Sequence, residues 1–195
     1  MSFGRKALQP DQTHTGGHNL HVERQTVTRT RRLVVTTWMP GDVDDLHKLH
    51  SDPQTMRFVG PGRPETREEC DHRLASYLNE QRTRGWTKWR VQTPKGSMIG
   101  RAGFGAHGPN RELGYTLRPD SWGHGLATEL ALALVRWHTE NPDPNGPPDL
   151  WAYAAVENIA SRRVLEKVGF DFIDDRDHHG TSCAFYVFTY GPRLG

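Results

Sequence analysis

The sequence predicts one mixed α/β domain in which helices flank a sheet containing an antiparallel meander. Three observations support this fold class. The 195 residues suffice for one substantial core but are few for two complete domains. Alternating or β-branched runs are interleaved with stretches of helical apolar spacing, in the order β-α-α-β-β-β-α-β-α-β-β. The chain also carries no internal repeat.

The N-terminal segment is predicted to be a flexible extension outside this domain. Residues 1–31 are rich in Thr, Gln, His and Gly and lack periodic apolar spacing, so the domain is expected at 32–190. No apolar segment follows Arg5 and Lys6, as a secretory signal would require. No run reaches the roughly 18 apolar residues typical of a membrane span. We therefore expect a soluble cytoplasmic protein that does not enter a membrane.

The first half of the domain is predicted to hold a strand, two helices and the meander. The run 32–38 is rich in β-branched residues, which is typical of a strand. Apolar residues spaced three apart follow Asp42, a suitable helix N-cap. A longer helix begins at the capping box of Thr66 and Glu69 and stops at Gly85. Three alternating runs joined by short turns predict the meander, at 86–93, 97–105 and 110–119.

The second half is predicted to hold a helix, a strand and a further helix. The first of these helices carries an apolar stripe that includes Leu130 and Leu134. A loop rich in Pro and Gly separates it from a strand at 149–156. Asn158 is a good N-cap for the last helix, and Gly169 is positioned to end it.

Two closing strands are predicted at 170–176 and 182–190, around a turn that contains His178 and His179. The last strand is strongly apolar and is expected at an edge of the sheet, where a homodimer would cover it. The two turn histidines lack the partners of a metal site, so no metal is expected.

Charge and cysteine content argue against several other functions. The formal net charge is +2, and the basic residues are dispersed apart from the segment 29–32, which disfavours a nucleic-acid binder. Cys70 and Cys183 are too few and too distant in sequence for a disulfide framework or a cysteine zinc site.

The segment 118–137 combines two glycines with the start of a helix. Gly123 and Gly125 are poor helix formers, so they either make a tight turn or allow a ligand to approach the backbone. A helix N-terminus offers unpaired N–H groups and partial positive charge, which suit a phosphate. No Gly-Lys-[Ser/Thr] follows, and Thr128 replaces the third glycine of a dinucleotide-binding motif.

Three segments together resemble the GNAT superfamily of acetyl-CoA-dependent N-acetyltransferases. They are "RRLVVTTWMPGDVDDLHKLHSDP" (31–53), "YTLRPDSWGHGLATE" (115–129) and "NIASRRVLEKVGF" (158–170). The subgroup they resemble most includes the ribosomal-protein alanine N-acetyltransferases. This resemblance implies the single-domain GNAT fold, with a mostly antiparallel central sheet that splays between the strands at 110–119 and 149–156.

The resemblance also implies acetyl-CoA as cosubstrate. Backbone N–H groups between Gly123 and Thr128 would hold the pyrophosphate, and the strand backbone before them would pair with the pantetheine arm. The implied cofactor-binding residues are Tyr115, Thr116, Leu117, Trp122, Gly123, His124, Gly125, Leu126, Ala127, Thr128 and Asn158.

The resemblance implies that the acceptor amine attacks the thioester directly, without an acyl-enzyme. This reaction requires a proton acceptor for the amine and a proton donor for the thiolate. Glu112 is the candidate base and Ser161 the candidate acid, although Ser161 could equally serve only to cap its helix. Carboxylates near the last hairpin are alternative bases that the sequence cannot rank, namely Asp174, Asp175 and Asp177.

Two functions remain open from the sequence. The first is an N-acetyltransferase acting on a primary amine, either a protein N-terminus or a small molecule. The second is a non-catalytic GNAT-fold module that binds coenzyme A as a sensor or partner. Fold alone does not identify the acceptor.

Overall fold

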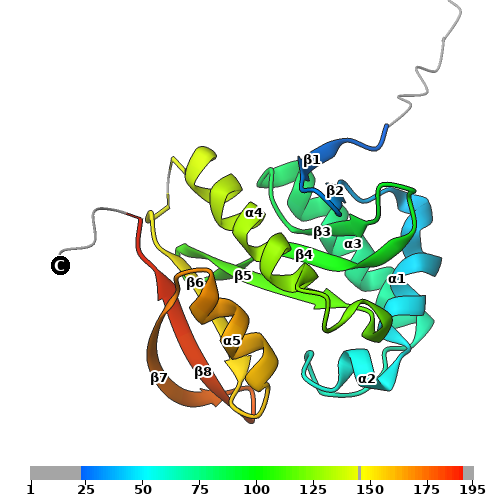
Figure 1. The fold of residues 1–195 in the computed structure, drawn as a ribbon. Helices are drawn as coiled ribbons and strands as arrows, with labels where there is room; N and C mark the ends of the chain where they lie inside the picture. Colours follow the sequence, from blue (N-terminus) through cyan, green and yellow to red (C-terminus); the bar gives the residue numbers. More distant parts are fainter. Residues whose placement is uncertain (1–22, 145, 191–195) are drawn as a thin grey trace, which may run out of the picture.

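A computed structural model describes residues 23–144 and 146–190 and shows one sheet with helices on both faces (Figure 1). The eight strands are β1 (Thr26–Arg29), β2 (Val34–Thr36), β3 (Lys88–Gln92), β4 (Met98–His107), β5 (Asn110–Leu117), β6 (Leu150–Ala155), β7 (Asp171–His178) and β8 (Thr181–Phe188). Their order in the sheet is β1-β2-β3-β4-β5-β6-β8-β7.

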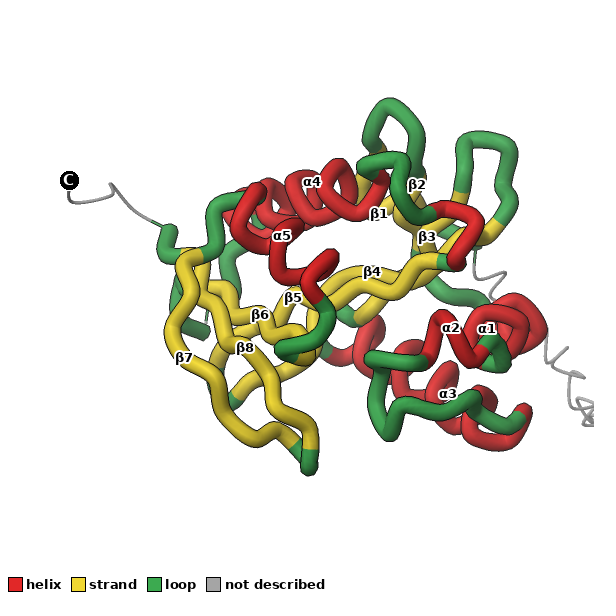
Figure 2. The backbone as a smooth tube through the Cα atoms, turned by 60° about the horizontal axis from the view of Figure 1, so that its bottom comes forward, coloured by secondary structure: helices red, strands yellow, loops and turns green. Residues whose placement is uncertain are grey.

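The helices form two layers. They are α1 (Val43–His50), α2 (Pro53–Met56), α3 (Arg67–Thr83), α4 (Leu126–Glu140) and α5 (Ile159–Lys167), with short 3₁₀ turns at Pro40–Asp42 and Pro119–Ser121. Figure 2 shows α4 and α5 on one face of the sheet and α1, α2 and α3 on the other. None of the described helices is long and apolar enough to cross a lipid bilayer.

All neighbouring strands pair antiparallel except β5 and β6, which are parallel. The predicted mixed, mostly antiparallel sheet is therefore confirmed, and so is the meander, which β3, β4 and β5 form. A parallel pair needs a long crossover, and here α4 and the loop after it supply the connection.

Two apolar cores lie on opposite faces of the sheet. The larger core, under α4 and α5, includes the fully buried Trp89, Phe104 and Leu134. The smaller core, under α1 and α3, includes Trp38 and Leu74. The two cores fix both helix layers on the sheet.

The predicted helix signals hold with one difference. Thr66 and Glu69 form the expected capping box of α3, in which each side chain bonds the other residue's backbone N–H. Asp42 precedes α1 but makes no side-chain cap. Its carboxylate instead binds Arg24 and the backbone N–H of Met39.

The predicted boundary at residue 31 differs from the structure. Thr26–Arg29 form β1, which pairs with β2 and adds an edge strand to the sheet. The segment is short and half exposed, so it lacks the apolar periodicity by which strands are recognised. Residues 1–22 lie outside the described residues.

The expectation that the last strand lies at an edge is wrong. Strand β8 lies between β6 and β7, and β7 is the edge. A strand paired on both sides is apolar because it is buried, so its composition no longer argues for a homodimer. The edge strand β7 is exposed along nearly its whole length and contains four aspartates.

Candidate active site

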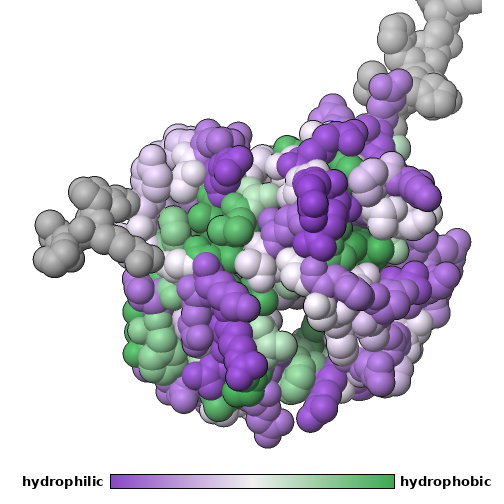
Figure 3. Space-filling view, in the orientation of Figure 1, coloured by the Kyte–Doolittle hydropathy of each residue, from purple (hydrophilic) through white to green (hydrophobic). Residues whose placement is uncertain are grey.

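The candidate site lies where β5 and β6 part. The two strands pair only at their starts, where residues 111–113 face residues 150–152. Beyond this point β5 stays paired with β4, and β6 stays paired with β8. Among the described residues, the β6 side of residues 114–117 therefore has no strand partner. This is the predicted splay, and Figure 3 shows the surface hollowed nearby, between α5 and the α2 segment.

The start of α4 supplies free backbone donors beside this gap. Gly123 and Gly125 have φ of +77° and +71°, a left-handed conformation that favours glycine. Gly125 is the N-cap of α4 and has no side-chain cap. Within the described part of the chain, no hydrogen bond uses the N–H groups of residues 123–128. Such donors suit an anionic ligand.

Trp122 connects this loop to the end of β5. Its indole Nε1 donates to the carbonyl oxygen of Leu117 at 2.8 Å, while about half of the residue remains exposed. The Leu117 carbonyl therefore has a partner already, which leaves Tyr115 and Thr116 as the backbone nearest the gap.

Arg32 is a site residue that the sequence did not reveal. Its guanidinium donates to the carbonyl oxygen of His124 at 2.9 Å and to Glu129 at 2.7 Å. The backbone N–H of Arg32 also bonds Glu129. Arg32 therefore binds the outward carbonyl of the glycine loop and holds the loop against α4. No local signal could show this, because Arg32 and Glu129 lie 97 residues apart.

Helix α5 and strand β5 each place one hydroxyl group at the gap. Asn158 caps α5, as predicted, by accepting from the N–H of Ser161 at 3.1 Å. The Ser161 Oγ lies 2.9 Å from the Tyr115 hydroxyl. Burial raises the pKa of Tyr115 to about 12, although the Ser161 hydrogen bond opposes the shift. The Tyr115 phenol is therefore protonated at neutral pH.

Glu112 lies on the opposite face of the same strand. Side chains alternate along β5, so Tyr115 faces α4 and α5 while Glu112 faces the α3 side. The Glu112 residue is 6% exposed, and its Oε2 lies 3.3 Å from Lys88 Nζ. The candidate base and the candidate proton donors therefore approach the gap from opposite faces.

Two glycines make room for the Glu112–Lys88 pair. A Cβ added at Gly105 would lie 2.7 Å from a Glu112 carboxylate oxygen, and one at Gly114 would lie 2.7 Å from Lys88 Cε. The register places Gly105 opposite Glu112 on the neighbouring strand. Any other residue at these positions would have to displace the pair.

Tyr153 and His178 border Glu112 from the β6 and β7 side. Their rings are 4.3 Å apart. Burial, and after it the charge of Glu112, raises the pKa of Tyr153 to about 12. Burial and His179 lower the pKa of His178, while Glu112 opposes the shift. Both rings therefore lie within the electrostatic field of the candidate base.

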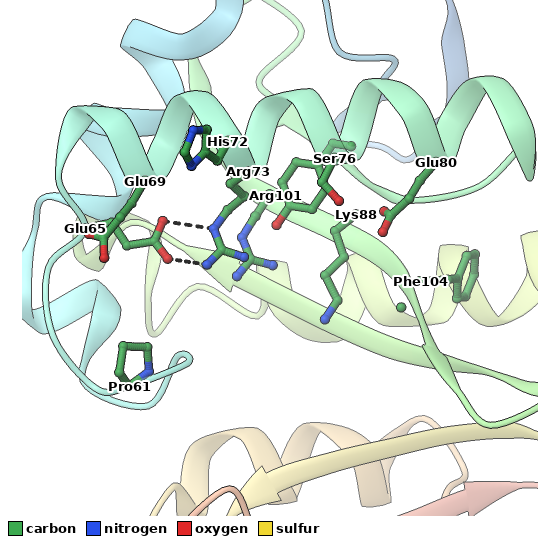
Figure 4. Close-up of a pocket in the computed structure, with 12 residues that line it drawn as sticks. Pro61, Glu65, Glu69, His72, Arg73, Ser76, Glu80, Lys88, Arg101 and Phe104 are labelled. Atoms are coloured by element: carbon green, nitrogen blue, oxygen red, sulfur yellow. Dashed lines mark hydrogen bonds and ion pairs between the residues drawn. The ribbon is translucent and has the colours of Figure 1, made fainter.

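A cavity of about 540 Å³ lies between α3 and strands β3 and β4 (Figure 4). Lys88 and Gly105 line it, so the cavity reaches the surroundings of Glu112. Its size is within the range of small-molecule sites. The cavity lies on the face opposite the glycine loop, where an acceptor could approach the gap.

A buried group beside this cavity has the composition of a metal site. Ligand atoms of His50, Glu65 and Cys70 lie within 4.8 Å of one another. Arg73 forms an ion pair with Glu65, and Arg101 donates to His50. Two guanidinium groups on the same cluster oppose a cation, so these residues do not fit a metal.

The remaining candidate residues are distributed as follows. Leu126, Ala127 and Thr128 form the half-buried first turn of α4. The alternative bases lie on the exposed edge strand β7, where Asp174 pairs with Arg176 and Asp177 accepts from the turn N–H of Gly180; the third is Asp175.

The splayed sheet and the uncapped glycine start of α4 define the class of GNAT-fold acyltransferases. The chain belongs to the GNAT acetyltransferase family, because the profile of the acetyltransferase (GNAT) domain matches residues 32–171.

Individual relatives are distant. The uncharacterized N-acetyltransferase YoaA of Bacillus subtilis is 23% identical over 148 residues, which cover 74% of this chain and 82% of that protein. A structure described as a GNAT-family acetyltransferase from Bordetella pertussis has 22% identity and a TM-score of 0.72, covering 85% of this chain and 99% of its own. The ribosomal L7/L12 α-N-protein acetyltransferase RimL, solved with coenzyme A, has 17% identity and a TM-score of 0.72. The match covers 84% of this chain and 97% of the RimL chain. At these identities the structural likeness shows the fold.

Proposed function

We propose that the protein transfers an acetyl group from acetyl-CoA to a primary amine by direct attack on the thioester. The observation that carries this proposal is the unpaired edge of β5. On one face this edge meets the free donors of α4, and on the other it meets Glu112 and the cavity. The structural likeness to RimL, which was solved with coenzyme A, is consistent with this cosubstrate.

The cofactor would run from the glycine loop into the gap. The N–H groups of residues 123–128 would bind the pyrophosphate, because they lie at a helix N-terminus and have no hydrogen-bond partner in the part of the chain that the structure describes. The backbone of Tyr115 and Thr116 would pair with the pantetheine amides along the open edge of β5. Asn158 and Ser161 would border the thiol end from α5.

The reaction needs one proton acceptor and one proton donor. Glu112 would take a proton from the acceptor amine, directly or through water, and the nitrogen lone pair would then attack the carbonyl carbon. As the C–S bond breaks, the thiolate would receive a proton from the Ser161–Tyr115 pair.

The experiment combines calorimetric titration of acetyl-CoA with a thiol-release assay on a panel of primary amines. Wild-type protein is expected to bind acetyl-CoA and release thiol with at least one amine. Glu112→Gln should reduce kcat/KM by about 10²- to 10⁴-fold, as expected for loss of a general base, with unchanged acetyl-CoA affinity. Glu140→Gln, at an exposed glutamate at the end of α4, is the matched control.

Other outcomes would separate the alternatives. Binding without thiol release across the panel would favour the non-catalytic coenzyme A module. Absence of acetyl-CoA binding would remove both functions. An unchanged rate in Glu112→Gln would exclude this residue as the base and redirect attention to the aspartates of β7.

A further inference from the structure

The cavity between α3 and β4 contains charged side chains, and most of them are paired. Glu65 binds Arg73, and Glu69 binds Arg63. Lys88 is paired with the candidate base. Figure 4 shows the members of these pairs that line the cavity, namely Glu65, Glu69, Arg73 and Lys88. Most of the charge in the cavity wall is therefore neutralised by a neighbouring protein group.

Arg101 is different, because no carboxylate among the described residues pairs with its charge. The residue is 4% exposed and lines the cavity. Its Nε donates to His50 Nε2 at 2.9 Å, and among the described residues its two terminal nitrogens have no acceptor. Tyr77 offers a ring whose centroid is 6.0 Å away, which is no counterion. A buried guanidinium without a carboxylate is costly, so a bound anion would relieve it.

His50 does not neutralise Arg101. Arginine can only donate, so His50 Nε2 is the unprotonated nitrogen and Nδ1 donates to Glu65 at 2.8 Å. Burial, followed by the charge of Arg101, lowers the pKa of His50 to about 4. The imidazole is therefore neutral at pH 7. Together with Glu65 it holds the guanidinium in place beside the cavity without removing its charge.

The opposite end of the cavity is acidic. Glu80 lies about two turns along α3 from Arg73 and accepts a hydrogen bond from Thr87 at 2.6 Å. At this end Lys88 lines the cavity and pairs with Glu112, which lies just behind it. One end therefore suits an ammonium group and the other suits a carboxylate.

The strand register gives the distance from Arg101 to the point where the gap begins, at Gly114, beside the Glu112 carboxylate. Arg101 lies opposite Thr116, whereas Gly103 lies opposite Gly114, where the gap begins. Two residues of strand separate the two positions, or about 7 Å. Two residues of an extended peptide span the same length, about 7 Å. An acceptor of dipeptide length would thus reach from the gap to the level of Arg101.

We propose that Arg101 binds a carboxylate of the acceptor, so that the preferred acceptors are amines with a carboxylate about two residues away. This rests on the proposed acetyltransferase function and specifies its substrate class. The carboxylate has two sources: the C-terminus of a free dipeptide, or an acidic side chain directly after a protein's N-terminal residue.

The first test compares matched acceptors with the wild-type protein. The free-dipeptide arm pairs Ala-Ala with Ala-Ala-amide, and the protein N-terminus arm pairs Ala-Asp-Ala-Ala-amide with Ala-Asn-Ala-Ala-amide. The carboxylate form is expected to have a kcat/KM about 10- to 100-fold higher, as for a charge-assisted hydrogen bond. The arm that shows the preference identifies the source. Equal kcat/KM within both arms would overturn the proposal.

The second test removes the guanidinium. Arg101→Gln should reduce the ratio of carboxylate to amide kcat/KM to about one. Arg67→Gln is the control, because it removes a positive charge from α3 at a position outside the cavity lining and should keep the wild-type ratio. If Arg101→Gln fails to fold, Arg101→Lys replaces it, and the ratio should fall to an intermediate value. A ratio unchanged in a folded Arg101 variant would overturn the proposal.

A binding measurement separates this proposal from the proposed function. N-acetyl-Ala-Ala and its amide are titrated into the protein by calorimetry, without any transfer step. Tighter binding of the acid, lost in Arg101→Gln, would support the carboxylate site even if no amine is acetylated. Acetylation of amines without preference for the acid in either assay would overturn the carboxylate site and leave the acetyltransferase function standing.

Discussion

Replacing Gly125 by alanine tests the proposed phosphate site directly. Gly125 has φ of +71° and ψ of 9° as the N-cap of α4. An added Cβ would meet only an Arg32 nitrogen, at 3.8 Å, so the protein itself offers no steric obstacle. The folding cost is therefore the left-handed backbone alone, about 1–2 kcal/mol. A phosphate close to the backbone would meet the methyl group in addition.

Gly85→Ala is the matched control for this substitution. Gly85 follows α3 with φ of +75°, and nothing lies within 4 Å of the Cβ position. Both variants should lose the same 1–2 kcal/mol or so, which lowers the melting temperature by about 2–8 °C in a domain of this size. Only Gly125→Ala should lose cofactor affinity. Loss of one or two charge-assisted hydrogen bonds corresponds to about 2–4 kcal/mol, or roughly 30- to 1000-fold in Kd.

The assay is calorimetric titration of acetyl-CoA into wild type and both variants, with thermal unfolding of each. If Gly125→Ala binds acetyl-CoA as tightly as Gly85→Ala, the glycine loop is only a turn. The pyrophosphate would then have to bind elsewhere.

Three further predictions concern the Arg32 contact with the loop, the Ser161–Tyr115 hydrogen bond and the buried His50–Glu65 pair. Arg32→Met should weaken acetyl-CoA binding about tenfold, because one charge-assisted hydrogen bond holds the loop, and titration checks this. Ser161→Ala should lower kcat more than it changes the KM for acetyl-CoA in steady-state kinetics, while a larger effect of Tyr115→Phe would assign the donated proton to the phenol. Urea unfolding should show stability falling from pH 6.5 to pH 5 by about 1.5 kcal/mol, because unfolded His50 binds a proton that the buried ring, with its pKa near 4, does not. The slope should flatten in His50→Gln, and a slope that persists there would exclude this residue. Below pH 4.5 stability should fall further because of Glu65. Burial opposes the shift, but the Arg73 hydrogen bond lowers the pKa of Glu65 to about 2 in the folded protein. As the pH falls, the Glu65 carboxyl is therefore protonated in the unfolded chain before it is protonated in the folded one.

Much of the fold could be predicted because its signals are local. The capping box of Thr66 and Glu69, the Asn158 cap and the stop at Gly85 each depend on residues within one helical turn or at a helix end. Alternation likewise indicates strands, because neighbouring side chains face opposite sides of a sheet. The order of the strands in the sheet could not be predicted in the same way. The interior position of β8 was predicted wrongly, because an apolar strand has the same sequence pattern at an edge of a sheet or in its middle.

The candidate site likewise contains residues that local sequence signals indicate and residues that only the folded structure brings together. Residues 123–125 could be identified from the sequence, because only glycine adopts the left-handed backbone there without strain. Pairing across the sheet decided the rest. The contacts of Arg32 with the loop and of Lys88 with Glu112 join residues brought together by strand register and helix packing. The isolation of Arg101 is likewise a property of a packed interior, because a charge has a counterion or lacks one only after the whole chain has folded around it.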